Sequence, residues 1–301
     1  MHFSSLFFII LAAIPFSSSA SSPRRLNHAA FSFDEAKLAC GYAGAAYCSG
    51  HRGKGVEDWS FKYKDWGGMK KLNATSFYGP VHDTNGYVGF DGEKSIWASF
   101  AGTDPLSIRS WLDDLNFPKT TDHPACSDCK VHEGFLESWN EVKAQVISLI
   151  KTLLSAHPKA KVHITGHSLG AAIATLALVD LIDTFGSSKI ATVYNFGSPR
   201  VGNTNFSEFT DSLDVQLYRT THGHDPVPHL PPEDFIVHFR HAPREVFWSS
   251  SAKWDASAGK MCDGTGEDPT CADANIADIW IPDHLSYYDF PFTTNYLSCK
   301  F

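Results

Sequence analysis

The chain has 301 residues, of which 43% are hydrophobic and 13% aromatic, so it can bury a large core and is not a disordered polypeptide. Its formal net charge is -8, and no cluster of Lys and Arg offsets the negative mean field, which argues against a nucleic-acid partner. No repeat or low-complexity linker divides the sequence after its N-terminal segment. We therefore expect a single domain over residues 30–301.

The first 20 residues predict a signal peptide. Residues 1–20 contain no Lys, Arg, Asp or Glu, and their apolar stretch at 6–14 is too short to span a bilayer. Small residues at 18–20 suit cleavage by signal peptidase, whereas a buried N-terminal helix is the alternative. Residues 21–29 then form a short N-terminal or pro segment, in which Arg24-Arg25 is either a second processing point or solvated charge. We expect a secreted, extracellular protein with no transmembrane anchor.

The rest of the chain predicts alternating strands and helices. An amphipathic segment over 33–46 comes first, and β-type runs follow at 86–90 and 96–100. Apolar residues at three- and four-residue spacing predict a helix over 135–154. The later elements are expected as a strand at Val162, a helix from Ala171, and strands at 191–196 and 215–218. This alternation predicts an α/β fold with a central, mainly parallel sheet and helices on both faces.

The most informative motif is Gly166-His167-Ser168-Leu169-Gly170, which lies between a β-branched run and an Ala/Leu-rich run. A strand, a sharp turn and a helix in this order raise the hydroxyl of the serine out of the sheet edge. Glycines flank the serine because the turn brings both positions close to other parts of the chain. A plain glycine-rich turn is the alternative, but the context favours Ser168 as a nucleophile.

A nucleophilic serine needs an imidazole to accept its proton and a carboxylate to orient that imidazole. In folds of this type the chain order is serine, acid, histidine. Asp225 directly follows an expected strand, at the edge of the sheet where sites lie, so we expect it to be the acid rather than a turn aspartate. The loop position of His284 near the C-terminus favours it as the base over the other histidines that follow Asp225.

The oxyanion formed in acyl transfer needs preorganised N–H donors. Leu169 offers one at the start of the helix after the serine, where backbone donors have no acceptor within the helix. The turn at Gly102-Thr103, after the 96–100 strand, is expected to supply the other, and Thr103 can add its hydroxyl. An ordinary turn would have the same sequence.

A short amphipathic helix follows this turn. Its apolar stripe, at i, i+3, i+4 and i+7, consists of Ile108, Trp111, Leu112 and Leu115. A surface helix packed on the core would show the same stripe. Directly after an oxyanion loop, however, the pattern favours a lid that covers the site in water and lays its apolar side on a lipid surface.

Seven cysteines in an exported chain predict three disulfides and one free thiol, but their spacing leaves the pairing open. Cys262 and Cys271 bracket a Gly- and Pro-containing loop that a disulfide could close. Cys126 and Cys129 form either a small loop clasp or a redox or zinc pair, and the clasp is the commoner case outside the cell.

Two sequons, at Asn73 and Asn205, predict glycosylation sites that an exported chain could use. No metal is expected, because His163 and His167 flank a strand end without a third ligand in the sequence. The expected chemistry requires no cofactor.

Together these motifs resemble the fungal-type class 3 triacylglycerol lipase family, from about residue 30 to the end of the chain. The matching stretches are 100–103, 107–115, 131–135, 166–170, 195–202, 225–232 and 283–287. The resemblance implies a single lipase domain with an α/β-hydrolase-like fold and a short helical lid around Leu106 to Trp111. It also implies the roles that the residues themselves suggest, with Ser168, Asp225 and His284 as a triad and Thr103 and Leu169 as oxyanion donors.

The same resemblance implies the disulfides Cys48–Cys299, Cys126–Cys129 and Cys262–Cys271, with Cys40 left free. The sequence departs from the family pattern at two places. Ala101 replaces the Arg that usually precedes the oxyanion-loop glycine, which leaves the ion pairing of that loop open. Asp104-Pro105 changes the start of the lid.

We therefore expect a secreted serine carboxylesterase that hydrolyses acylglycerols at an oil–water interface through an acyl-enzyme and works as a monomer. The alternative is a soluble esterase of the same fold, such as a feruloyl esterase, which tends to carry a polar, fixed flap. The apolar Ile108 and Trp111 favour the lipase. A third possibility is a lipid- or glycan-binding module whose site is inactive.

Overall fold

The computed structural model of the chain describes residues 30–50, 55–115, 119–234 and 237–299. The expected signal peptide at 1–20, the segment 21–29 and the Arg24-Arg25 pair lie outside these ranges. The expectation of one domain over residues 30–301 stays a prediction. Within the described ranges, no helix is both long enough and apolar enough to cross a bilayer.

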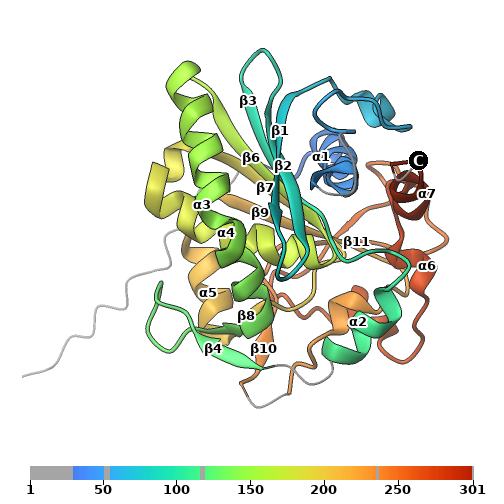
Figure 1. Cartoon of the computed structure of the whole chain (residues 1–301). Helices are drawn as coiled ribbons and strands as arrows, with labels where there is room; N and C mark the ends of the chain where they lie inside the picture. The colour runs from blue at the N-terminus through green and yellow to red at the C-terminus, as the bar shows by residue number, and fades with distance from the viewer. Residues whose placement is uncertain (1–29, 51–54, 116–118, 235–236, 300–301) are drawn as a thin grey trace, which may run out of the picture.

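The centre of the molecule is a twisted eight-stranded sheet (Figure 1). In spatial order its strands are β1 (Asn73–Gly79), β2 (Thr84–Phe90), β3 (Ser95–Phe100), β6 (Lys161–His167), β7 (Ile190–Phe196), β9 (Gln216–His222), β11 (Glu245–Trp248) and β12 (Lys260–Met261). The strands from β3 to β11 run parallel, whereas β1, β2 and β12 pair antiparallel at the two edges. The mainly parallel sheet expected from the sequence is confirmed.

Helices cover both faces of this sheet. On one face α1 (Phe33–Ala45) packs against β6 and β7, and on the other α3 (Glu133–Ala156) and α4 (Leu169–Phe185) pack against the sheet and each other. The apolar stripe of α3 is buried, as its spacing predicts, at Phe135, Trp139, Val142, Val146 and Ile150. Each face therefore has its own core, and the core around α1 is rich in aromatic rings.

A second, four-stranded sheet lies outside the main one. Its strands, in spatial order, are β10 (Phe239–Arg240), β8 (Gly202–Asn203), β5 (Lys130–His132) and β4 (Thr120–Asp122). The remaining elements are α2 (Ile108–Leu115), α5 (Thr204–Ser212), α6 (Ile281–His284), α7 (Phe292–Ser298), β13 (Ser286–Tyr287), β14 (Phe290–Pro291) and the 3-10 turns η1 (Ala46–Cys48), η3 (Trp66–Gly68), η4 (Ser187–Lys189), η5 (Val227–His229) and η6 (Ala272–Asn275). Strands of two or three residues are too short to show an alternation of apolar and polar residues in the sequence.

One placement from the sequence was wrong in detail. His284, expected in a loop, is the last residue of the four-residue helix α6. Such a helix is too short to show apolar periodicity, and Pro282 in its first turn is compatible with a helix start. The strand expected at 215–218 also continues, as β9, to His222, so it ends three residues before Asp225. We call residues 223–230, which follow this strand and include Asp225, the acidic loop.

The disulfides join the pairs that the family resemblance implies. They are Cys48–Cys299, Cys126–Cys129 and Cys262–Cys271, with Cα–Cα distances of 5.2, 5.4 and 6.3 Å, and Cys40 is free and buried. The first bridge ties η1 to the C-terminal helix α7, 251 residues apart in the chain. The C-terminal segment is therefore fixed to the layer that contains α1.

The side chain of His132, at the end of β5, is largely buried without a charged partner. Its ring stacks on Phe135, with centroids 4.1 Å apart, and its Nδ1 lacks a hydrogen-bond partner among the described residues. Burial lowers the pKa of His132 from 6.5 to about 4. The folded protein therefore holds this histidine neutral where the unfolded chain would charge it.

We expect the free energy of unfolding to fall as the pH drops from 6.5 towards 4, because the unfolded chain then binds more protons at His132 than the folded one. The loss from this residue should be about 1.4 kcal/mol per pH unit. Denaturant unfolding of His132→Gln at several pH values should give a flatter dependence than the wild type. The exposed His82→Gln is the control, and parallel curves for His132→Gln and the wild type would contradict the assignment.

Candidate active site

Ser168 lies in a sharp turn between β6 and α4 with φ +60° and ψ -131°, a backbone conformation that side chains rarely adopt. The glycines on either side are sterically required. A Cβ on Gly166 would lie 2.2 Å from the carbonyl oxygen of Gly170, and one on Gly170 would lie 2.2 Å from that of Phe100. The motif thus forms the strained turn that its sequence predicts.

Asp225 and His284 meet beside this turn. Asp225 follows the end of β9, and its Oδ2 lies 2.9 Å from Nδ1 of His284. A Cβ on Gly197 would lie 2.8 Å from that carboxylate oxygen and 2.9 Å from that ring nitrogen, so glycine leaves just enough space for the pair. Nε2 of His284 and Oγ of Ser168 are both buried and have no hydrogen-bond partner among the described residues. Buried polar atoms without partners are rare in structural regions, so both are candidates for groups that act on a substrate.

The carboxylate of Asp225 is buried but well supported. Its Oδ2 also accepts a hydrogen bond from the Tyr287 hydroxyl, at 2.5 Å, and its Oδ1 accepts one from the Val227 N–H, at 2.8 Å. Burial alone would raise the pKa of Asp225, but the His284 ring and these donors outweigh it and hold the pKa below its usual value. The acid is therefore an anion. Tyr287 was missed as a site residue, although it lies only three positions after His284.

The turn after β3 approaches Ser168 closely. A Cβ on Gly102 would lie 2.8 Å from Cβ of Ser168 and 2.6 Å from the His167 carbonyl oxygen. The neighbouring Thr103 has a buried hydroxyl with no partner among the described residues. Leu169 is the first residue of α4, where backbone N–H groups have no acceptor within the helix. The turn and the helix start thus flank Ser168, as an oxyanion site requires.

Comparisons with known proteins identify the family of the chain. Residues 97–235 match the family model "Lipase (class 3)". A lipase from Rhizopus niveus is 38% identical over 71% of this chain and 53% of its own length, and secreted mono- and diacylglycerol lipase 1 from Fusarium solani is 35% identical over 82% and 73%. The chain belongs to the class 3 lipase family. It spans only about half the length of the Rhizopus relatives that it matches.

Solved structures of this family have the same fold. The lipase from Rhizopus microsporus var. chinensis superimposes with a TM-score of 0.75 at 31% identity, over 87% of this chain and 88% of its own. A triacylglycerol lipase whose catalytic centre is described as a serine protease triad gives a TM-score of 0.74 at 31% identity, over 88% and 98%. The α/β-hydrolase fold expected from the sequence is confirmed.

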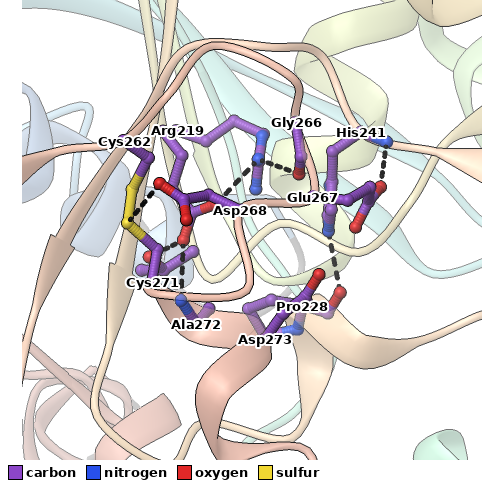
Figure 2. A network of polar contacts seen from close by, with 12 residues as sticks. Arg219, Pro228, His241, Cys262, Gly266, Glu267, Asp268, Cys271, Ala272 and Asp273 are labelled. Atoms are coloured by element: carbon purple, nitrogen blue, oxygen red, sulfur yellow. Dashed lines mark hydrogen bonds and ion pairs between the residues drawn. A yellow bond between two sulfur atoms is a disulfide. The ribbon is translucent and has the colours of Figure 1, made fainter.

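Buried polar groups hold the loop that carries Asp225 in place. Nε2 of His241 lies 2.7 Å from the Pro228 carbonyl oxygen, and its backbone N–H donates to Glu267 (Figure 2). The guanidinium of Arg200 donates to the carbonyl oxygens of His229 and Pro231 and pairs with the same Glu267. These contacts join the acidic loop to the segment closed by the Cys262–Cys271 disulfide. In the sequence, Arg200 stood out only as part of the matching stretch 195–202.

Helix α2 lies next to α6, which ends at His284 (Figure 1). Its Ile108 and Leu112 are only 4% and 9% exposed. The side chain of Ser168 is also buried, with 1% of the residue exposed. Between α2, the acidic loop and residues 276–281 remains a cleft of about 410 Å³, lined by Leu112 and three isoleucines among others. Trp111 packs partly buried against the core, whereas Leu106, two residues before α2, is 63% exposed.

The structure places the two departures from the family pattern as follows. Ala101 is buried, and its backbone N–H donates to the Asn85 carbonyl oxygen. The carboxylate of Asp104 accepts hydrogen bonds from the Leu106 N–H and from the Tyr296 hydroxyl of α7. The turn before α2 is therefore attached to α7.

Among the described residues, one cluster has the spacing of a metal site, Glu245 with Cys262 and Cys271, and its cysteines are joined in a disulfide. The ring nitrogens of His167 both have partners within the protein, and Nδ1 of His163 lies 2.9 Å from the Thr192 hydroxyl. These histidines do not converge on a common point. The side chains of the two sequon asparagines, Asn73 and Asn205, are exposed, and their glycosylation stays a prediction.

Replacing Gly197 by Ala should separate Asp225 from His284, because the added methyl group would overlap both side chains. We expect the rate at which a fluorophosphonate labels Ser168 to fall by about 100-fold. Gly92→Ala is the control, since Gly92 also has a positive φ, of +80°, but apart from its two chain neighbours no described residue has an atom within 4 Å of its Cβ position. Equal labelling rates for both variants would mean that the Asp225–His284 contact does not govern the reactivity of Ser168.

Proposed function

We propose that this protein is a secreted serine carboxylesterase that hydrolyses acylglycerols, with Ser168 as nucleophile, His284 as base and Asp225 as acid. The observation that carries the proposal is the buried hydrogen bond between His284 and Asp225 beside a serine in a strained turn. The proposal is supported by the relatives, which are described as lipases and as mono- and diacylglycerol lipases. Secretion is supported by the character of residues 1–20 and by the disulfides.

The bond to Asp225 takes up Nδ1–H of His284 and leaves Nε2 to accept a proton. In the proposed reaction Oγ of Ser168 attacks the ester carbonyl while its proton passes to Nε2. The ionised Asp225 stabilises the resulting imidazolium. The imidazolium then protonates the departing alcohol, and an acyl-enzyme forms. Water, deprotonated by the same nitrogen, releases the fatty acid.

The N–H of Leu169 and the hydroxyl of Thr103 are proposed to bind the oxyanion of both tetrahedral intermediates. The free, buried hydroxyl of Thr103 supports this role, because a donor kept unpaired in the resting protein costs no reorganisation during the reaction. Leu169 contributes the positive end of the α4 dipole as well.

We further propose that α2, with Leu106 ahead of it, is a lid. Its buried Ile108 and Leu112 and its partly buried Trp111 would face water if the helix moved away, which is unfavourable unless a lipid surface receives them. Leu106 already offers an exposed apolar contact. The protein is therefore proposed to open at an oil–water interface and to act there as a monomer. A soluble esterase with a fixed flap is the alternative.

Replacing the acid should lower turnover without unfolding the protein. We expect Asp225→Asn to reduce kcat on a soluble short-chain ester by about 10,000-fold and Ser168→Ala to abolish it, together with fluorophosphonate labelling. Asp211→Asn is the control, since Asp211 is an exposed carboxylate on α5. A folded Asp225→Asn variant with full activity would reject the proposed triad.

A charge at Leu106 should affect only the reaction at an interface. Leu106→Asp is expected to lower the rate on emulsified triglyceride about 10-fold or more and to leave the rate on a dissolved ester unchanged, because burying a carboxylate in lipid is costly. Val81→Asp, at another exposed apolar residue, is the control. A wild-type preference for dissolved feruloyl esters over emulsified triglyceride would instead favour the soluble esterase.

A further inference from the structure

The histidine within the nucleophile turn is buried and has a partner at both ring nitrogens. Nε2 of His167 lies 2.7 Å from the carbonyl oxygen of His284, and Nδ1 lies 2.7 Å from the Tyr47 hydroxyl. The ring also stacks on Phe292, with centroids 3.8 Å apart. His167 thus contacts the backbone of the base residue while it is covalently joined to Ser168.

These two contacts determine which nitrogen carries the proton. A carbonyl oxygen can only accept, so Nε2 must donate to His284 and Nδ1 must accept from the Tyr47 hydroxyl. This is the neutral imidazole. Burial, assisted by the neighbouring His284, lowers the pKa of His167 well below its usual value. The ring therefore remains in the tautomer that bonds to the carbonyl.

Tyr47 is the second member of this arrangement. It is fully buried in η1, next to the cysteine that is bridged to Cys299. A Cβ on Gly102 would lie 2.4 Å from the Tyr47 hydroxyl oxygen, so this hydroxyl also lies directly against the expected oxyanion turn. One side chain thus borders both the His167 ring and the Gly102-Thr103 turn.

We propose that Tyr47 and His167 are positioning residues that fix the backbone of His284 relative to Ser168. The inference rests on the proposed function and adds to it a second constraint. Asp225 orients the ring of His284 through Nδ1, whereas His167 holds the carbonyl oxygen of the same residue. The orientation of the His284 ring does not by itself set the distance between that ring and Ser168. The hydrogen bond from His167 sets this distance, because His167 is the residue adjacent to Ser168.

Removing the Tyr47 hydroxyl tests this role. In Tyr47→Phe Nδ1 of the His167 ring loses its hydroxyl donor, so the ring is held less firmly, and we expect kcat on a dissolved ester to fall about 10- to 100-fold with KM unchanged. Fluorophosphonate labelling of Ser168 should slow by the same factor. Tyr42→Phe is the control, because Tyr42 is as buried as Tyr47 and its hydroxyl also donates a hydrogen bond, in this case to the backbone carbonyl of Lys70, but it lies outside the site. Its kcat should stay within about 2-fold of the wild type.

A pair of substitutions at His167 separates positioning from packing. Gln can supply both an N–H donor and an acceptor near the positions of the ring nitrogens, whereas Leu fills space only. We expect His167→Gln to retain at least about 10-fold more kcat than His167→Leu, with similar thermal midpoints. Equal kcat for the two variants, or wild-type kcat for Tyr47→Phe, would overturn the inference. If Ser168→Ala kept its activity, the proposed function itself would fail.

Discussion

The candidate active site depends on one buried hydrogen bond, between the carboxylate of Asp225 and the ring of His284. Removing a carboxylate from water is costly, so a buried one persists only where donors replace the lost water. Here three donors do so, on His284, Tyr287 and Val227. They keep the carboxylate ionised despite its burial. An anion fixed in this way determines the tautomer and orientation of the imidazole beside it.

The sheet places these groups at one edge because its central strands are parallel. The ends of β3, β6 and β9 carry the Gly102 turn, Ser168 and the acidic loop, so residues far apart in the chain meet there. Glycines at the closest approaches leave space for these contacts, and Gly197 is the clearest case. The disulfide that fixes α7 and the hydrogen bond from Tyr296 to Asp104 attach the turn before α2 to the same part of the molecule.

The candidate residues that could be chosen from the sequence are those with a local pattern around them. The turn around Ser168 could be recognised because a β-branched run, two glycines and an Ala/Leu-rich run are contiguous, and Asp225 could be chosen because it follows a strand. Tyr47 and Arg200 could not, since their roles depend on contacts that no local pattern encodes. Tyr47 is 120 residues from His167. The helix α6 and the second sheet were missed because elements of two to four residues show no periodicity.

In the proposed mechanism Ser168 and His284 form one reacting pair, which the proposed lid α2 covers; in this structure the two residues are 1% and 0% exposed. The most direct measurement is the distance from Nε2 of His284 to Oγ of Ser168 in a crystal structure of the protein after reaction with a fluorophosphonate. We expect a distance of about 3 Å with α2 displaced. A distance of more than about 5 Å, or a phosphonate attached to another residue, would contradict it.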